Sequence, residues 1–219
     1  MINNDYHSNR SNPVTFKQIL RNDIPAKVLE NKKFIVLATG PSAVGKDSVL
    51  GELLDKFNKI VTHTTRAKRE GEIEGKSYFF TTVDKFVEGI KNNEFVEYVK
   101  GFSGKYYGTK KATIKNALDG KRPALAIVDV DGAASIRNNL KDDPEVNVVS
   151  IFFQPPQQNP LQVLKERMLK RGSETADSIK ERLGRAEYEM SRAKEFDAEI
   201  EVNNVEESVK DIVELLHLK

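Results

Sequence analysis

The sequence predicts an α/β fold in which helices cover both faces of a parallel sheet. The main observation is the continuous apolar run of residues 34–39, which is typical of a strand buried on both faces of such a sheet. Further strands are expected at residues 124–130, 146–153 and 199–202. Helical segments lie between them, and the clearest are residues 178–194 and 205–216, whose apolar side chains repeat on one face. Strands that alternate with such helices favour a parallel sheet wrapped on both sides.

A glycine-rich loop directly after the first strand predicts a phosphate-binding site. Its residues are Gly40, Pro41, Ser42, Ala43, Val44, Gly45, Lys46, Asp47 and Ser48, close to the pattern G-x-x-x-x-G-K-[ST]. In this motif the backbone N–H groups wrap a phosphate and the lysine reaches the β- and γ-phosphates. The alternative is a simple glycine-rich turn. Because a strand precedes the loop and helically spaced apolar residues follow it within 49–57, we expect residues 40–48 to bind ATP.

Asp47 departs from this pattern, because the position normally holds Ser or Thr, whose hydroxyl binds Mg²⁺. A carboxylate oxygen can also bind Mg²⁺. Alternatively, Asp47 is an acid in the first turn of a helix, where it suits the helix dipole. The next residue, Ser48, cannot take over the position because it points about 100° away on a helix. Both roles of Asp47 remain open at this point.

Composition limits the classes of partner. The net charge of +2 gives no broad field for nucleic acid or membrane, and no apolar run approaches the roughly 20 residues that span a bilayer. The absence of Cys excludes disulfides and thiol catalysis and is compatible with a reducing cytosol. The polar N-terminus does not resemble a secretory signal. We therefore expect a cytoplasmic protein, monomeric or homodimeric, whose partners are small molecules.

The chain of 219 residues suits one domain with inserted parts. Residues 1–31 are expected to form a partly disordered extension, with a short helix and a turn within 13–30. Residues 32–61 and 110–219 would form the core. Residues 62–109 differ, because strand-like pieces at 78–80 and 95–98 surround a short helix at 83–90, and they are expected to form an inserted mixed subdomain. The proline-rich loop at 154–160 should border the site, since ligands bind beyond the C-terminal strand ends of such sheets.

Arg66 and Arg69 suggest a second anion site in the inserted part. They lie three residues apart beside Gly71 and Gly75, and Tyr78 follows. Two guanidinium groups and a phenol make a good pocket for a phosphate monoester. On their own, however, the two arginines are more typical of a solvated basic turn.

Several ordered motifs together resemble the guanylate kinase family. They are Thr64-Thr65-Arg66-x-x-Arg69-x-x-Glu72-x-x-Gly75-x-x-Tyr78-x-Phe80, Phe95-Val96-Glu97-Tyr98, Gly104-Lys105-Tyr106-Tyr107-Gly108-Thr109, Asp129-Val130-Asp131, Arg171-Gly172-Ser173-Glu174-Thr175 with Arg182-Leu183, and Val202-Asn203. The likeness covers residues 34–216 and includes the phosphate loop. It implies a P-loop NTPase-like core, a GMP-binding subdomain at 62–109 and a helical lid at about 155–177.

The resemblance also implies a role for each matching residue in transfer of a phosphoryl group from ATP to GMP or dGMP with Mg²⁺. Residues implied at the acceptor are Thr62, Arg66, Arg69, Glu72, Tyr78, Glu97, Tyr107, Thr109 and Asp131. Of these, Glu97 suits guanine because a carboxylate can accept from N1–H and the N2 amino group. Lys46, Arg171 and Arg182 would act on the transferring group, Asn203 would contact ATP, and Asp47 and Asp129 would lie near Mg²⁺. Individually, the tyrosines could be sheet aromatics, the arginines surface charges and Asp129 a loop cap.

Three departures from the family keep alternatives open. Asp47 replaces the loop Ser or Thr, about two residues including a Gln are missing after Asp131, and the segment 155–160 is about two residues longer than expected. The Lys46-Asp47-Ser48 sequence is similar to the loop of ribose 1,5-bisphosphate kinases. The alternatives are therefore such a sugar-phosphate kinase, or a guanylate kinase-like binding domain without activity. Retention of Gly40, Gly45 and Lys46 argues against the binding domain.

Overall fold

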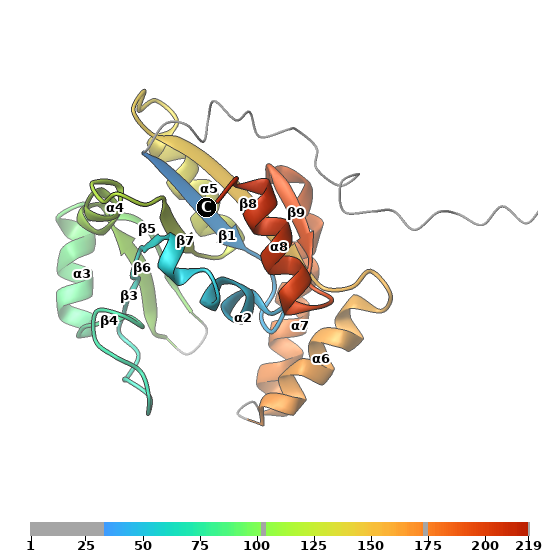
Figure 1. Ribbon diagram of the computed structural model, residues 1–219. Helices are drawn as coiled ribbons and strands as arrows, with labels where there is room; N and C mark the ends of the chain where they lie inside the picture. The colour runs from blue at the N-terminus through green and yellow to red at the C-terminus, as the bar shows by residue number, and fades with distance from the viewer. Residues whose placement is uncertain (1–32, 102–103, 173–174, 219) are drawn as a thin grey trace, which may run out of the picture.

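The computed structural model describes residues 33–101, 104–172 and 175–218, and its centre is a five-stranded parallel sheet (Figure 1). The strand order is β2-β7-β1-β8-β9, and the bounds are β1 Phe34–Thr39, β2 Asn58–Lys59, β7 Ala124–Ile127, β8 Asn147–Gln154 and β9 Ala198–Glu201. Every residue of β1 is buried, as its apolar run predicts. The predicted fold class, a parallel sheet with helices on both faces, is confirmed. The extension at residues 1–31 and its predicted helix lie outside the described residues.

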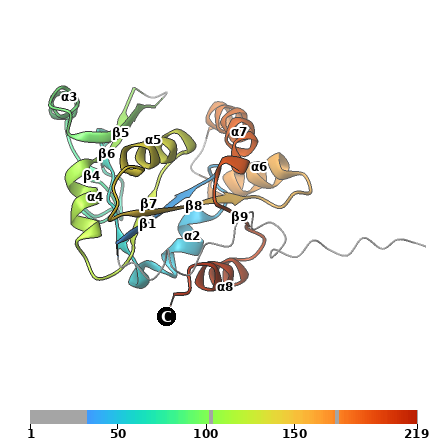
Figure 2. The same ribbon diagram turned by 90° about the horizontal axis from the view of Figure 1, so that it is seen from above.

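Helices cover both faces of this sheet (Figure 2). On one face α2 (Lys46–Gly51) and α8 (Val205–Leu215) pack against Val36 and Ala38 of β1. On the other face α4 (Lys111–Leu118) and α5 (Val130–Leu140) pack against Ile35 and Leu37. Successive residues of β1 thus contribute to two different apolar clusters, because side chains alternate between the faces of a strand.

A second sheet lies beside the first and is mixed rather than parallel. Its order is β4-β3-β6-β5, and its elements are β3 His63–Thr64, β4 Phe79–Phe80, β5 Phe95–Lys100 and β6 Tyr106–Lys110. Helix α3 (Val83–Lys91) begins at the N-cap residue Thr82, whose side chain accepts from Lys85 N, and Phe86 stacks on Phe95 at 4.3 Å. This unit contains the strand and helix pieces expected within residues 62–109.

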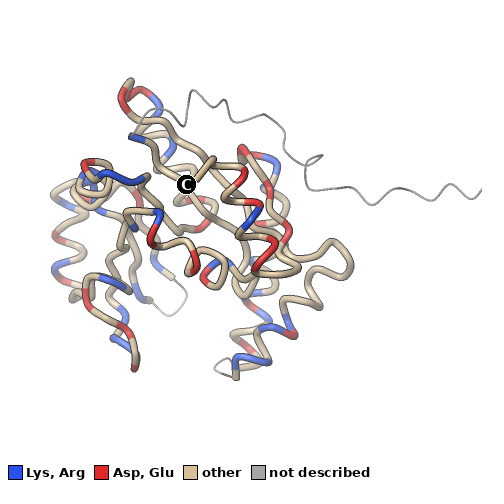
Figure 3. The backbone as a smooth tube through the Cα atoms, in the orientation of Figure 1, with Lys and Arg blue, Asp and Glu red and all other residues tan. Residues whose placement is uncertain are grey.

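Two further helices stand on the opposite side of the phosphate loop from the mixed sheet (Figures 1 and 2). They are α6 (Pro160–Arg171) and α7 (Ala176–Ser191), which is followed by a 3₁₀ turn at Ala193–Glu195. Lys and Arg are interspersed with Asp and Glu along the helices rather than gathered by sign (Figure 3). Within the described ranges no helix is long and apolar enough to cross a membrane.

Some predicted boundaries are wrong. The strand expected at 124–130 ends at Ile127, because Asp129 caps α5 and Val130 begins that helix. The helical pattern at 49–57 is divided between α2, which ends at Gly51, and a 3₁₀ turn at Leu54–Lys56. The helix expected at 178–194 runs from Ala176 to Ser191, because the side chain of Thr175 accepts from Ser178 N and caps it.

Candidate active site

The phosphate loop has the backbone that its glycines predict. Gly40 and Gly45 have φ values of 138° and 113°, which L-residues with a side chain rarely adopt. A Cβ atom on Gly40 would also clash with the carbonyl oxygen of Phe153 in β8. The loop therefore lies directly against the neighbouring strand, and this close approach needs a residue without a side chain.

Lys46 lies at the start of α2 and turns back over the loop. Its ammonium group donates hydrogen bonds to the carbonyl oxygens of Gly40 and, at 3.0 Å, of Pro41. Burial lowers the pKa of Lys46 to about 8, while the nearby carboxylates of Glu189 and Asp47 act in the opposite direction. An anionic phosphate bound beside Lys46 would favour the positively charged form of this side chain, which burial disfavours.

One cleft of about 320 Å³ brings the predicted donor and acceptor residues together. Gly40, Ser42 and Lys46 line it from the phosphate loop. The opposite wall comes from the mixed sheet and the end of β7, and consists of Thr62, Tyr78, Glu97, Val99, Tyr107, Ile127, Val128 and Asp129. The cleft thus lies beyond the C-terminal ends of the parallel strands, where ligands bind in such sheets.

Glu97 is the largely buried carboxylic acid of this wall. Burial raises its pKa to about 7, and the negative charge of Asp129 acts in the same direction. Thr109 partly compensates, because its hydroxyl donates to Glu97 Oε1 at 2.6 Å. The second oxygen, Oε2, accepts no hydrogen bond from the residues that the structure describes.

The predicted acceptor-phosphate residues form a cluster around Arg66. Its guanidinium group makes a bidentate pair with Glu72, at 2.6 and 3.0 Å, and lies 5.2 Å from the ring centre of Tyr78. The hydrogen bond from Arg66 lowers the pKa of Glu72 to about 2. Tyr107 lies 6.2 Å from Tyr78, ring to ring. The side chain of Arg69 makes no hydrogen bond or ion pair with any described residue.

The two arginines predicted to act on the transferring group differ in position. Arg182 in α7 donates to the hydroxyl of Ser42 in the phosphate loop at 2.7 Å. Arg171 is exposed at the end of α6, and its charge contributes to the lowered pKa of Lys46. Sequence reasoning missed Arg167, which donates to the carbonyl oxygens of Val44 and Val202 at 2.6 and 2.9 Å. No motif marks Arg167, because it recognises backbone atoms.

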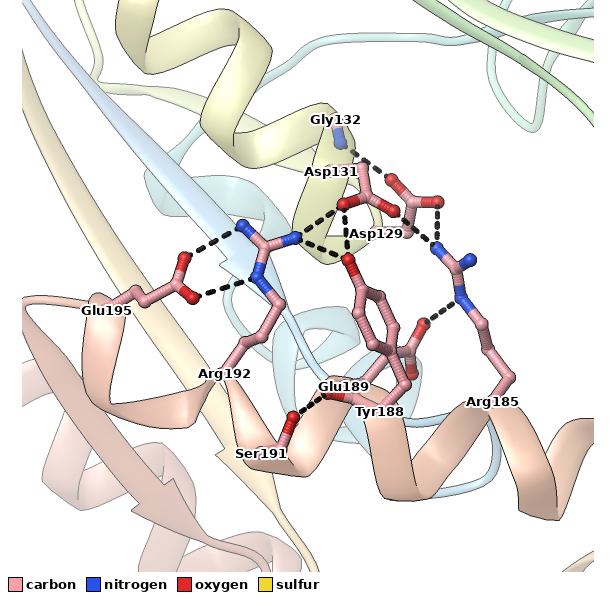
Figure 4. A network of polar contacts seen from close by, with 9 residues as sticks. All are labelled: Asp129, Asp131, Gly132, Arg185, Tyr188, Glu189, Ser191, Arg192 and Glu195. Atoms are coloured by element: carbon pink, nitrogen blue, oxygen red, sulfur yellow. Dashed lines mark hydrogen bonds and ion pairs between the residues drawn. The ribbon is translucent and has the colours of Figure 1, made fainter.

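Asn203 and Asp131 do not line the cleft. The Asn203 amide is exposed and donates to Glu201 at 2.6 Å. Asp131, predicted to face guanine, instead accepts from Arg185 at 2.9 Å, from the Tyr188 hydroxyl at 3.0 Å and from Arg192 (Figure 4). The physical reason is that α5 begins at Val130, which places Asp131 in the first helical turn beside α7.

The two predicted metal ligands have different surroundings. Asp129 Oδ1 accepts from Gly132 N at 2.7 Å and Oδ2 from Arg185 at 3.0 Å, so it is a helix cap as well as a residue of the cleft. The carboxylate of Asp47 is exposed and accepts no hydrogen bond from the described part of the chain, and its charge acts on both Lys46 and Tyr78. No group of three or more potential metal-ligating side chains occurs among the described residues. Mg²⁺ in kinases usually needs only one or two carboxylates with substrate phosphates and water, which Asp47 fits.

Comparisons of sequence and of structure with known proteins identify the same family. A family model described as guanylate kinase matches residues 31–219. A guanylate kinase of Prochlorococcus marinus (strain MIT 9312) is 37% identical over 191 residues, 86% of this chain and 99% of that protein. One of Mesoplasma florum is 38% identical over 192 residues, 86% of this chain and 62% of that protein. The crystal structure of guanylate kinase from Anaplasma phagocytophilum covers 84% of both chains with 29% identity and a TM-score of 0.64. With the phosphate loop and the cleft, these matches show that the chain belongs to the guanylate kinase family.

Proposed function

We propose that this chain transfers the terminal phosphoryl group of ATP to GMP or dGMP, giving ADP and GDP or dGDP. The observation that carries the proposal is the single cleft in which Lys46 of the phosphate loop faces Tyr78, Glu97 and Tyr107. The donor side suits a triphosphate, and the acceptor side offers a phosphate-binding cluster and a carboxylate for guanine. We further propose a place in purine nucleotide metabolism, in the cytoplasm, with small-molecule partners only.

The chemistry is mainly alignment and charge stabilisation. The acceptor phosphate is already an anion, so no strong general base is required. Lys46 would bind the phosphates of ATP after exchanging its bonds to the loop carbonyls, and Arg182 would orient the same loop from α7. Arg66, Tyr78 and Tyr107 would hold the acceptor phosphate in line, and the lid with the mixed sheet would exclude water.

Mg²⁺ with ATP completes the proposal, and Asp47 is the residue that would hold it. The ion would neutralise charge that develops on the transferring phosphoryl group. Asp129 would first have to exchange its ion pair with Arg185. Asp47→Ser, which restores the usual hydroxyl, should keep activity with Mg²⁺. In this variant Mg²⁺ should strengthen ATP binding by a smaller factor than in the unmodified protein. An equal factor in the two proteins would remove Asp47 from the metal site.

The test of the function is a coupled assay of ADP release with ATP and Mg²⁺. The acceptors are GMP, dGMP, AMP, UMP, CMP and ribose 1,5-bisphosphate. Turnover restricted to GMP and dGMP is expected. The Asp47 loop favours the sugar bisphosphate as a second candidate, and activity on that compound alone would support it. No turnover with any acceptor would favour a binding domain.

A further inference from the structure

Arg185 of α7, which no sequence motif marks, is the centre of a polar network (Figure 4). Its terminal Nη2 donates to Asp129 Oδ2 at 3.0 Å and to Asp131 Oδ2 at 2.9 Å. Its Nε donates to Glu189 Oε1 at 3.4 Å. One guanidinium group therefore joins three carboxylates from two separate parts of the chain.

The acceptor wall of the cleft depends on one of these carboxylates. Asp129 lines the cleft and caps α5 through Gly132 N, 2.7 Å away. A Cβ atom on Gly132 would lie 3.4 Å from Glu97 Oε2, so the first turn of α5 lies directly behind the proposed guanine carboxylate. A shift of the β7–α5 junction, defined as residues 128–132, would therefore displace both Asp129 and the surface that supports Glu97.

Helix α7, which carries Arg185, also contacts the phosphate loop on the donor side of the cleft. Arg182, Arg185 and Glu189 are three and four residues apart, so they lie on one face of α7. Arg182 donates to Ser42 of the phosphate loop. Glu189 is only 7% exposed, and its negative charge is the main influence that opposes the lowering of the Lys46 pKa. This face of α7 thus acts on the phosphate loop at two points and on the acceptor wall at a third.

We propose that Arg185 is a positioning residue that fixes the β7–α5 junction and α7 relative to each other, and so aligns the acceptor wall with Arg182 and the phosphate loop. This inference rests on the proposed function for its kinetic consequences. Arginine suits the role because its planar group has several donors in fixed directions, whereas the ammonium group of lysine is a compact charge. Only Val128 and Asp129 connect β7 to α5, so an anchor at Asp129 fixes where α5 begins.

The kinetic test compares Arg185→Met and Arg185→Lys with Arg192→Met. Arg192 is a matched control, since it is the C-cap residue of α7 and its side chain binds Asp131, whereas among the described residues that side chain makes no hydrogen bond or ion pair with the carboxylates of Asp129 and Glu189. We expect Arg185→Met to raise the KM for GMP about ten- to hundredfold and to lower kcat, as misplaced reacting groups do. The KM for ATP should stay within about twofold, and Arg185→Lys should recover part of the loss. Arg192→Met should keep near-normal constants, since Arg185 still holds Asp131.

Hydrogen exchange provides a measurement that does not need activity. The amides of residues 130–133 should exchange faster in Arg185→Met than in the unmodified protein, while Arg192→Met should leave them unchanged. Unchanged exchange at the junction, or equal kinetic losses in the two methionine variants, would overturn the proposal. If the unmodified protein does not phosphorylate GMP, the proposed function fails, and the exchange rates still decide whether Arg185 positions the junction.

Discussion

Glu97→Gln is expected to stabilise the protein at alkaline pH while it weakens the use of GMP. Glu97 is largely buried, and burial with the negative charge of Asp129 raises its pKa from the ordinary 4.5 to about 7. A glutamine has nearly the same shape and its amide oxygen can still accept from Thr109. It removes the buried charge, and with it the second acceptor oxygen proposed for guanine.

The sign and size of the effect follow from the two pKa values. Between pH 4.5 and about 7 the native state keeps a proton on Glu97 that the unfolded state releases, so stability from this group falls as pH rises. Above pH 8 the loss is complete. At 1.36 kcal/mol per pH unit, the difference corresponds to about 3 kcal/mol. The variant should thus be more stable by less than about 1 kcal/mol at pH 5 and by about 3 kcal/mol at pH 8.5.

Urea unfolding of the unmodified protein and of Glu97→Gln from pH 5 to 8.5 measures this difference in the free energy of unfolding directly. Glu94→Gln is a matched control beside the same strand pair, because Glu94 directly precedes β5 and its ion pair with Lys110 lowers the pKa of Glu94. That variant should lose stability rather than gain it above the ordinary pKa of Glu94. A stability gap for Glu97→Gln that does not grow with pH would refute the reasoning, as would a gap of the opposite sign.

Four further variants test packing and binding separately. Gly40→Ala should abolish the thermal stabilisation by ATP, because its Cβ atom would clash with the Phe153 carbonyl oxygen and the position has a φ of 138°. Gly184→Ala has open space around it and should raise the free energy of unfolding by about 1 kcal/mol. Melting temperatures measured with and without ATP test both predictions. Ser150→Ala should lose about 1–3 kcal/mol in urea unfolding, since its buried hydroxyl donates to Asp197 at 2.6 Å; an unchanged midpoint would contradict this. Arg69→Met should raise the KM for GMP strongly at unchanged melting temperature and ATP binding, and an unchanged KM would remove Arg69 from the phosphate site.

The longer strands of the central sheet could be predicted from the sequence because they coincide with runs of apolar residues. The run 34–39 is apolar throughout, since both faces of β1 are covered by helices. Short strands were harder to find. The pieces Asn58–Lys59 and His63–Thr64 pair through only two residues each, and their positions depend on partners distant in the chain. Periodicity over two residues carries no such information.

The site could be predicted where a residue acts through the backbone shape or a fixed motif spacing. Gly40, Lys46 and Glu97 all line the expected cleft. Arg167 and Arg185 could not be found in this way, because their partners are backbone carbonyls and carboxylates that only the folded chain brings near. The direction of Asp131 could not be predicted for a similar reason, since it depends on where α5 begins and on the side chains that α7 brings beside its first turn.

The contrast between Asp47 and Asp129 bears on how this phosphate loop can work without its usual Ser or Thr. A motif-based comparison makes both carboxylates candidates for Mg²⁺. Asp129 already receives a backbone N–H and a guanidinium group, and loss of either would disturb the wall behind Glu97. Asp47 receives no donor from the described residues, and its charge reaches both Lys46 and Tyr78. Without a cation between them, that charge would repel the phosphates of ATP. We therefore expect ATP binding to depend more strongly on Mg²⁺ here than in a loop with a neutral hydroxyl, with Arg185 keeping Asp129 for the structure of the acceptor wall.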